Sequence, residues 1–259
     1  MPFLELKEVR LHYELSGNAG APVLLFSNSL GTSLEMWEGQ RAALEKQFRI
    51  LRYDKRGHGQ SSVPAAPYKI EQLGRDVLGL LDALQIAQVD FCGLSIGGLT
   101  GMWLALNAPQ RLRRLVLCNT GARIGSLEMW NARIEPVRQG GTRAIAPAAV
   151  ERFFSPEFRT RRPEEVLAAQ RVLEGTSSEG YVGCCAALRD ADLRNSVAQI
   201  HVPTLVIAGS KDEATPPTLA QHLCQQIAGA QYAELPAAHL SNIEATAEFN
   251  AAVSRFLGA

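Results

Sequence analysis

The sequence has no excess of charge of either sign and no long hydrophobic run. Its 26 lysine and arginine residues are balanced by 26 aspartate and glutamate residues, so the formal net charge is zero. A nucleic-acid-binding protein needs a basic field to neutralise phosphates, and the balance argues against that partner. The sequence contains no run of about 18 apolar residues, the length that is needed to span a bilayer. Residues 1–7 mix polar and apolar side chains, unlike a secretory signal, so we expect no membrane association.

Cysteine is also scarce, since the five cysteines are odd in number and none has Cys-x-x-Cys spacing. This pattern indicates free thiols in a reducing cytoplasm rather than a disulfide framework. The adjacent pair Cys184 and Cys185 lacks the usual spacing of zinc ligands, and no His-Glu-x-x-His motif occurs. We therefore predict a cytoplasmic protein without a metal or another cofactor. The 46% of hydrophobic residues in a chain of 259 is enough for a large buried core.

Short apolar runs alternate along the chain with amphipathic helical patterns. Two alternating runs at residues 3–6 and 9–15 predict an opening hairpin. Further strands are expected at residues 23–26, 48–53, 89–92, 115–118, 204–208 and 232–235, and helices at 70–84, 96–106, 218–227 and 245–257. Strands that alternate with helices indicate the α/β class, with a mainly parallel sheet covered on both faces.

The alternation stops between Gly121 and about Asn195. This stretch has helix-forming segments at residues 128–137, 146–154, 163–173 and 180–188 but no convincing strand. A connection of this length is too long for a simple link between two strands of one sheet. We therefore predict a helical cap at residues 121–194, inserted into a single core that is formed by residues 1–120 and 195–259.

The segment Gly93-Leu94-Ser95-Ile96-Gly97 lies between a predicted buried strand and a predicted apolar helix. In this context Gly-x-Ser-x-Gly forms a tight turn that presents a nucleophilic serine. The glycines are needed because a side chain there would collide with the strand or the helix. At a helix N-terminus, free N–H groups and the helix dipole favour developing negative charge. A glycine-rich turn with an incidental serine is the weaker interpretation, because strand and helix both lie where the motif needs them.

A serine nucleophile needs a base, and the base needs a carboxylate that orients it. Of the five histidines, His239 is the one expected in the loop between the last strand and the last helix. Asp212 follows the strand at 204–208, with Glu213 as its nearest competitor. The order Ser95, Asp212, His239 places all three at the carboxyl ends of strands, where open α/β sheets hold their sites. A turn aspartate and a loop histidine without catalytic roles are the alternatives.

A tetrahedral oxyanion needs backbone N–H donors. One donor should be Ile96, which directly follows the serine, and the other should come from the loop Ser27–Thr32, where we predict Leu30. A plain turn is the alternative for this loop. The glycine-rich segment at residues 54–61 lacks both G-x-G-x-x-G and the Walker lysine. We interpret it, together with His58, as structural rather than nucleotide-binding.

Together, these residues resemble the α/β-hydrolase family over essentially the whole chain. The match rests on the serine turn, residues 54–61, Asp212 and His239. More specific segments resemble the 3-oxoadipate enol-lactonases within that family; they are residues 27–32 with Met36-Trp37, residues 117–122 with 129–133, and residues 239–244. Asn28-Ser29 departs from the wider family, in which His-Gly is commoner. The resemblance implies an α/β-hydrolase fold, with a mainly parallel sheet flanked by helices and an inserted helical cap.

The resemblance also implies an activity, the hydrolysis of a small lactone with an acetate arm through an acyl-enzyme. This reaction belongs to the β-ketoadipate pathway of protocatechuate and catechol catabolism. Arginine suits the substrate carboxylate because it pairs bidentately. We predict Arg133 for this contact and Trp130 for an apolar wall, both in the first cap helix. A solvated arginine and a tryptophan in the cap core are the alternatives. The expected partner is thus a small carboxylated lactone, and a homo-oligomer is compatible with the sequence.

Other activities fit the same residues. A general carboxylesterase or a cofactor-free perhydrolase uses the same triad, and only the pocket under the cap distinguishes them from a lactonase. A haloalkane dehalogenase fits less well, because its chemistry requires aspartate in place of Ser95. From another class, a ligand-binding receptor with slow turnover uses this fold. Replacement of Ser95 by alanine separates enzyme from receptor, because an enzyme should lose on the order of 10⁶ in kcat.

Overall fold

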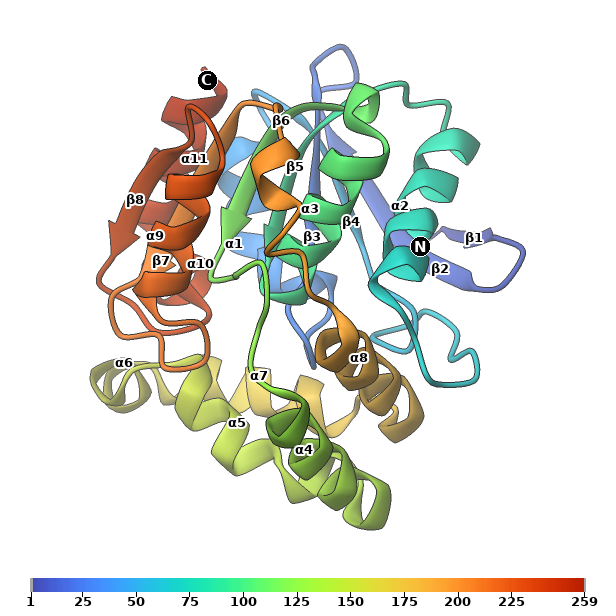
Figure 1. Cartoon of the computed structure of the whole chain (residues 1–259), viewed down its shortest axis with the longest axis vertical. Helices are drawn as coiled ribbons and strands as arrows, with labels where there is room; N and C mark the ends of the chain where they lie inside the picture. Colours follow the sequence, from blue (N-terminus) through green and yellow to red (C-terminus); the bar gives the residue numbers. More distant parts are fainter. Residues whose placement is uncertain (1, 259) are drawn as a thin grey trace.

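The structure is a computed structural model that describes residues 2–258. One sheet runs through the described chain, with the strand order β1-β2-β4-β3-β5-β6-β7-β8 (Figure 1). The strands are β1 (Phe3–Glu5), β2 (Arg10–Gly17), β3 (Val23–Ser27), β4 (Arg49–Tyr53), β5 (Val89–Leu94), β6 (Leu112–Cys118), β7 (Thr204–Gly209) and β8 (Gln231–Leu235). β2 is antiparallel to β1 and β4, and every other pair is parallel. The predicted hairpin and mainly parallel sheet are confirmed.

The central strands are continuous apolar runs because helices cover the sheet. Every residue of β3, β5 and β7 is buried, as a strand packed on both faces requires. The helices of the core are α1 (Glu38–Leu44), α2 (Ile70–Ala83), α3 (Ile96–Asn107), α9 (Pro217–Gln226), α10 (Ser241–Glu244) and α11 (Thr246–Leu257). α2 packs against α3, α1 packs against α11, and α9 packs on β7 and β8. The predicted core helices match α2, α3, α9 and α11.

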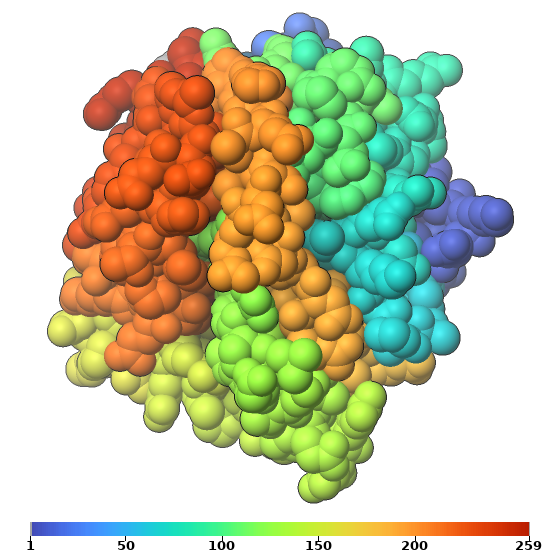
Figure 2. Space-filling view, viewed as in Figure 1, coloured from blue at the N-terminus to red at the C-terminus, as the bar shows by residue number. Residues whose placement is uncertain are grey.

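Five further helices lie between β6 and β7. They are α4 (Leu127–Gly140), α5 (Ala146–Phe153), α6 (Pro156–Arg161), α7 (Pro163–Glu174) and α8 (Ser178–Asp190), and the described residues between β6 and β7 form no strand. Figure 1 places them together below the ends of the parallel strands, and Figure 2 shows them closed against the rest of the molecule. Whether residues 121–194 form a domain with those boundaries stays a prediction. Among residues 2–258, no helix has both the length and the apolar character needed to cross a membrane.

Candidate active site

Ser95 occupies a strained turn between β5 and α3. Its backbone lies at φ 60° and ψ −117°, a conformation that non-glycine residues rarely adopt. A Cβ atom on Gly93 would lie 2.2 Å from the carbonyl oxygen of Gly97, and one on Gly97 would lie 2.2 Å from that of Ser27. Both positions therefore need glycine, for the steric reason that the sequence suggested. The turn leaves Ser95 at the N-terminus of α3, where it lines a cavity beneath α4 and α5.

His239 and Asp212 form a buried pair at the same end of the sheet. Asp212 follows β7, and His239 lies between β8 and α10. His239 Nδ1 lies 2.9 Å from Asp212 Oδ2, and His239 lines the cavity with Ser95. The other ring nitrogen, Nε2, lies 3.4 Å from the hydroxyl of Ser29. The exposed neighbour Glu213 borders the cavity, but its carboxylate forms no ion pair with His239.

The carboxylate of Asp212 is held by several donors besides His239. The backbone N–H groups of Ala214 and Thr215 donate to Oδ1 at 2.8 and 2.9 Å, and the Thr215 hydroxyl donates to Oδ2 at 2.5 Å. Burial alone would raise the pKa of Asp212, but the His239 charge and the hydrogen bonds from His239 and Thr215 lower the pKa to about 2. Asp212 is therefore ionised at neutral pH and can hold a proton on the Nδ1 atom of His239.

The cavity has a volume of about 130 Å³ and lies between these groups and the helices α4 and α5. Both predicted cap residues line it. Trp130 is 7% exposed and donates its indole N–H to the carbonyl of Ile124 at 2.7 Å, so it is at once cavity wall and part of the cap core. Arg133 is half-buried on α4 and takes part in no ion pair within residues 2–258. Within the described chain its guanidinium hydrogen-bonds with the phenol of Tyr181, another residue of the cavity wall, and not with a carboxylate. A cation that lacks a carboxylate partner beside a small cavity suits an anionic ligand.

A second arginine of this cavity, Arg152, was missed from the sequence. It lies in the last turn of α5, is half-buried, and forms no ion pair among the described residues. Its sequence context, Glu151-Arg152 on an amphipathic helix, is that of a solvated pair and gave no signal. The cavity thus combines Ser95 and His239 with two cations.

The loop after β3 carries the predicted donor Leu30, which also lines the cavity. The N–H groups on either side are occupied: that of Ser29 by the sulfur of Met36 at 3.4 Å, and that of Gly31 by His58 Nε2 at 3.0 Å. The Leu30 N–H has no partner among the described residues. Ile96 begins α3, where N–H groups lack partners within the helix. Two N–H groups near Ser95 are therefore available, and their role as oxyanion donors stays a prediction.

The segment at residues 54–61, predicted to be structural, holds this loop in place. Burial and the nearby charge of Lys55 lower the pKa of His58 well below its usual value, so its Nε2 accepts a hydrogen bond at neutral pH. Three hydrogen bonds join the two loops: Lys55 Nζ to the Ser29 carbonyl (2.6 Å), the Gly31 N–H to His58 Nε2 (3.0 Å), and the Leu34 N–H to Asp54 Oδ1 (2.7 Å). No motif in the sequence indicates these contacts.

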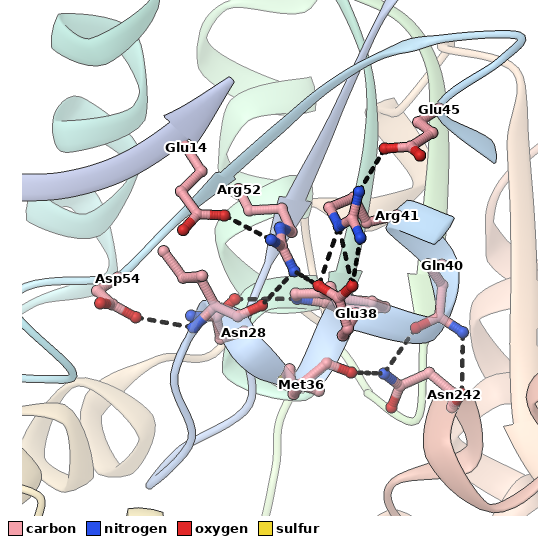
Figure 3. A network of polar contacts seen from close by, with 12 residues as sticks. Glu14, Asn28, Met36, Glu38, Gln40, Arg41, Glu45, Arg52, Asp54 and Asn242 are labelled. Carbon is pink, nitrogen blue, oxygen red and sulfur yellow. Dashed lines mark hydrogen bonds and ion pairs between the residues drawn. The ribbon is translucent and has the colours of Figure 1, made fainter. Parts of the chain in front are cut away.

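A polar network fixes the other side of the same loop (Figure 3). Asn28, which departs from the wider family, is fully buried and donates to the carbonyl of Tyr53 at 2.9 Å. Its side-chain oxygen accepts the indole N–H of Trp37 at 2.9 Å. Asn242, three residues after the histidine, donates to the carbonyl of Met36 at 2.7 Å. The network therefore connects the Leu30 loop to the segment that carries His239.

Comparison with known proteins agrees with this fold. Residues 22–246 match the family model described as alpha/beta hydrolase fold. The chain is 46% identical over 250 residues to 3-oxoadipate enol-lactonase 2 of Acinetobacter baylyi, covering 96% of this chain and 94% of that protein. It is 40% identical to 3-oxoadipate enol-lactonase 1 of the same organism, covering 95% and 92%. The crystal structure of the enol-lactonase from Burkholderia xenovorans LB400 is similar with a TM-score of 0.98 and 47% identity, over 100% of both chains.

Proposed function

This chain belongs to the α/β-hydrolase family, and from that premise we propose that it hydrolyses 3-oxoadipate enol-lactone to 3-oxoadipate. The predicted resemblance is confirmed, and with it the prediction of a hydrolase that acts on ester bonds. One observation supports the substrate most directly: a single small cavity holds Ser95, His239 and two arginines without ion-pair partners. Ser95 and His239 suit the ester bond of a lactone, and the two arginines suit its carboxylate arm.

The first step forms a tetrahedral intermediate on Ser95. His239 removes the proton of Ser95 Oγ through Nε2, and the oxygen attacks the ring carbonyl. Asp212 keeps the imidazole oriented and stabilises the imidazolium that forms. The N–H groups of Leu30 and Ile96 receive the oxyanion, and each such donor typically contributes about 10²–10³ in turnover.

The second step opens the ring and leaves the acyl-enzyme. Collapse of the tetrahedral intermediate breaks the ring C–O bond and expels an enolate, which is a better leaving group than an ordinary alkoxide. The imidazolium of His239 gives its proton to the enolate, and tautomerisation of the enol to the ketone then hinders closure of the ring. A water molecule that gives a proton to His239 attacks the acyl-enzyme, and collapse of this second intermediate releases 3-oxoadipate and restores Ser95.

The cap supplies substrate recognition in this proposal. Arg133 and Arg152 bind the acetate carboxylate, while Trp130 forms an apolar wall beside the ring. We place the reaction in protocatechuate and catechol catabolism in the cytoplasm. The cellular location is supported by the five cysteines, all of which are free thiols, as a reducing compartment allows.

The test mixes purified protein with freshly generated enol-lactone and follows the loss of its ultraviolet absorbance, beside Ser95→Ala and a simple aryl acetate. We expect fast opening of the lactone, slow hydrolysis of the aryl ester, and a loss on the order of 10⁶ in kcat for Ser95→Ala. A fast aryl ester with an untouched lactone would overturn the substrate assignment in favour of a general carboxylesterase. Lactone binding without turnover, unchanged in Ser95→Ala, would identify a receptor.

A further inference from the structure

Lys55 is a buried lysine that the proposed mechanism does not use. It lies two residues after β4 and is 2% exposed. Its Nζ atom donates a hydrogen bond of 2.6 Å to the carbonyl oxygen of Ser29. That oxygen is the one acceptor of the ammonium among residues 2–258, and no carboxylate there pairs with it. A buried ammonium with a single neutral acceptor costs stability, so its presence here calls for a functional explanation.

The Ser29 carbonyl and the Leu30 N–H belong to one peptide group. Resonance in that group couples its two ends, because electron density drawn toward the oxygen leaves the N–H more positive. A cation on the oxygen therefore makes the N–H a stronger hydrogen-bond donor, and this polarisation is larger in a low-dielectric interior. The Thr32 hydroxyl donates to the same oxygen at 2.9 Å. One end of the peptide is thus occupied by two donors, and the other end belongs to the cavity residue Leu30, whose N–H has no partner among the described residues.

Few charged or titratable groups surround the ammonium. In its own loop these are Asp54, which accepts from the Leu34 and Gln60 N–H groups, and the buried His58. From α8 the thiol of Cys184 faces it. Burial lowers the pKa of Lys55 to about 8, against the opposing influence of Cys184 and Asp54. The ammonium therefore persists at neutral pH and is lost at moderately alkaline pH.

We propose that Lys55 is a positioning residue of the oxyanion hole, whose ammonium holds the Ser29–Leu30 peptide and polarises the Leu30 N–H toward the tetrahedral oxyanion. This inference rests on the proposed serine mechanism but on no particular ester or lactone. Because the benefit grows as negative charge develops on the substrate oxygen, Lys55 stabilises the transition state more than the bound substrate. Its loss should therefore appear in kcat rather than in KM.

The experiment compares Lys55→Met, which removes the charge and the donor, with Lys55→Arg, which keeps a permanent cation. Lys46→Met, at an exposed lysine, is the matched control. Rates are measured on the enol-lactone and on an aryl acetate, so that failure of the lactone assignment leaves the test intact. We expect Lys55→Met to lower kcat about 10- to 100-fold on either substrate, with KM within about threefold and affinity for the product 3-oxoadipate unchanged. Lys55→Arg should recover most of kcat, and Lys46→Met should match the wild type.

The pH profile supplies a second measurement that does not depend on the folding of Lys55→Met. Wild-type kcat should fall on the alkaline side with an apparent pKa near 8, and this limb should be absent in Lys55→Arg because guanidinium does not titrate there. Circular dichroism at each pH verifies that the protein stays folded. A wild-type kcat that is flat from pH 7 to 10, or a folded Lys55→Met with unchanged kcat, would overturn the inference. If a folded Lys55→Met keeps its kcat and that activity still depends on Ser95, the role of Lys55 is overturned but the proposed function is not.

Discussion

The side-chain amide of Asn119 donates a hydrogen bond of 2.9 Å to Asp212 Oδ2, the carboxylate oxygen that also faces His239. Asn119 directly follows β6 and has a φ of 45°, in the left-handed region that asparagine tolerates better than most residues. The same amide reaches the carbonyl of Ala238 at 3.2 Å. One side chain therefore connects the acid to the loop that carries the base.

Replacement of Asn119 by glycine should lower kcat about tenfold, because it removes a hydrogen bond to a charged group while it preserves the left-handed backbone. Asn119→Ala should show the same loss of kcat and an additional loss of about 1 kcal/mol in the free energy of unfolding, from backbone strain. Ser241→Ala is the control, since Ser241 Oγ donates to Asn119 Oδ1 at 2.5 Å without touching Asp212. Steady-state kinetics and urea unfolding measure both effects. A kcat equal to wild type in Asn119→Gly would show that the amide does not orient the pair.

The two cavity arginines should determine recognition of the carboxylate. Arg133→Met and Arg152→Met should each raise KM for the carboxylated lactone by about 10- to 100-fold, since a hydrogen bond to a charged group contributes about 1.5–3 kcal/mol. Hydrolysis of a neutral aryl acetate should change less than threefold, because that substrate has no anion to bind. Arg138→Met, at an exposed arginine of the same helix as Arg133, is the control. If only one arginine variant shows the effect, that residue alone binds the carboxylate.

The sheet and the serine turn could be predicted because local sequence determines them. Continuous apolar runs such as β3 and β5 indicate strands buried on both faces, and the sterics of the turn restrict Gly93 and Gly97 to glycine. The proximity of Ser95, Asp212 and His239 could be predicted because parallel strands place their carboxyl ends at one edge of the sheet. The structure does bring them to that edge, while their catalytic roles stay a proposal.

The elements that sequence reasoning missed lack a local signal. α1 buries only Gln40 and Leu44, so it has no apolar stripe, and the six residues of α6 bury only Phe158. Arg152 and Lys55 are polar residues whose importance depends on what packs around them. Which cavity a side chain faces, and which carbonyl it reaches, follows from the three-dimensional arrangement of segments that are distant in sequence.

Glu244 joins the cap to the histidine loop. One of its oxygens accepts the backbone N–H of Ser155, at the start of α6, at 3.0 Å and that of Ala238 at 3.1 Å, and the other accepts the Ser155 hydroxyl. Glu244→Gln should lower the free energy of unfolding by about 1–3 kcal/mol, because a neutral amide with one oxygen accepts these hydrogen bonds less strongly than a charged carboxylate with two. It should also lower kcat, since the loop next to His239 loses an anchor. Glu248→Gln, at an exposed glutamate of α11, should leave both quantities unchanged.

The lowered pKa of Asp212 should also be visible as a pH-dependent contribution to stability. Its folded-state pKa of about 2 lies below the ordinary value of 3.8. A carboxyl group of this kind stabilises the folded state above its unfolded pKa, and that stabilisation is lost as the pH falls through the folded pKa. The contribution, about 2 kcal/mol by linkage, should be complete above about pH 4.5 and disappear between about pH 4 and pH 2.

Asp212→Asn cannot titrate in that window, so it isolates this contribution. The difference in free energy of unfolding between wild type and Asp212→Asn should shrink by about 2 kcal/mol between pH 4.5 and pH 2, as measured by urea unfolding at several pH values. At neutral pH Asp212→Asn should also lower kcat by about 10⁴, because the imidazole loses the partner that fixes its tautomer. A pH-independent difference in stability would mean that the carboxylate of Asp212 is not stabilised by its partners in the folded protein.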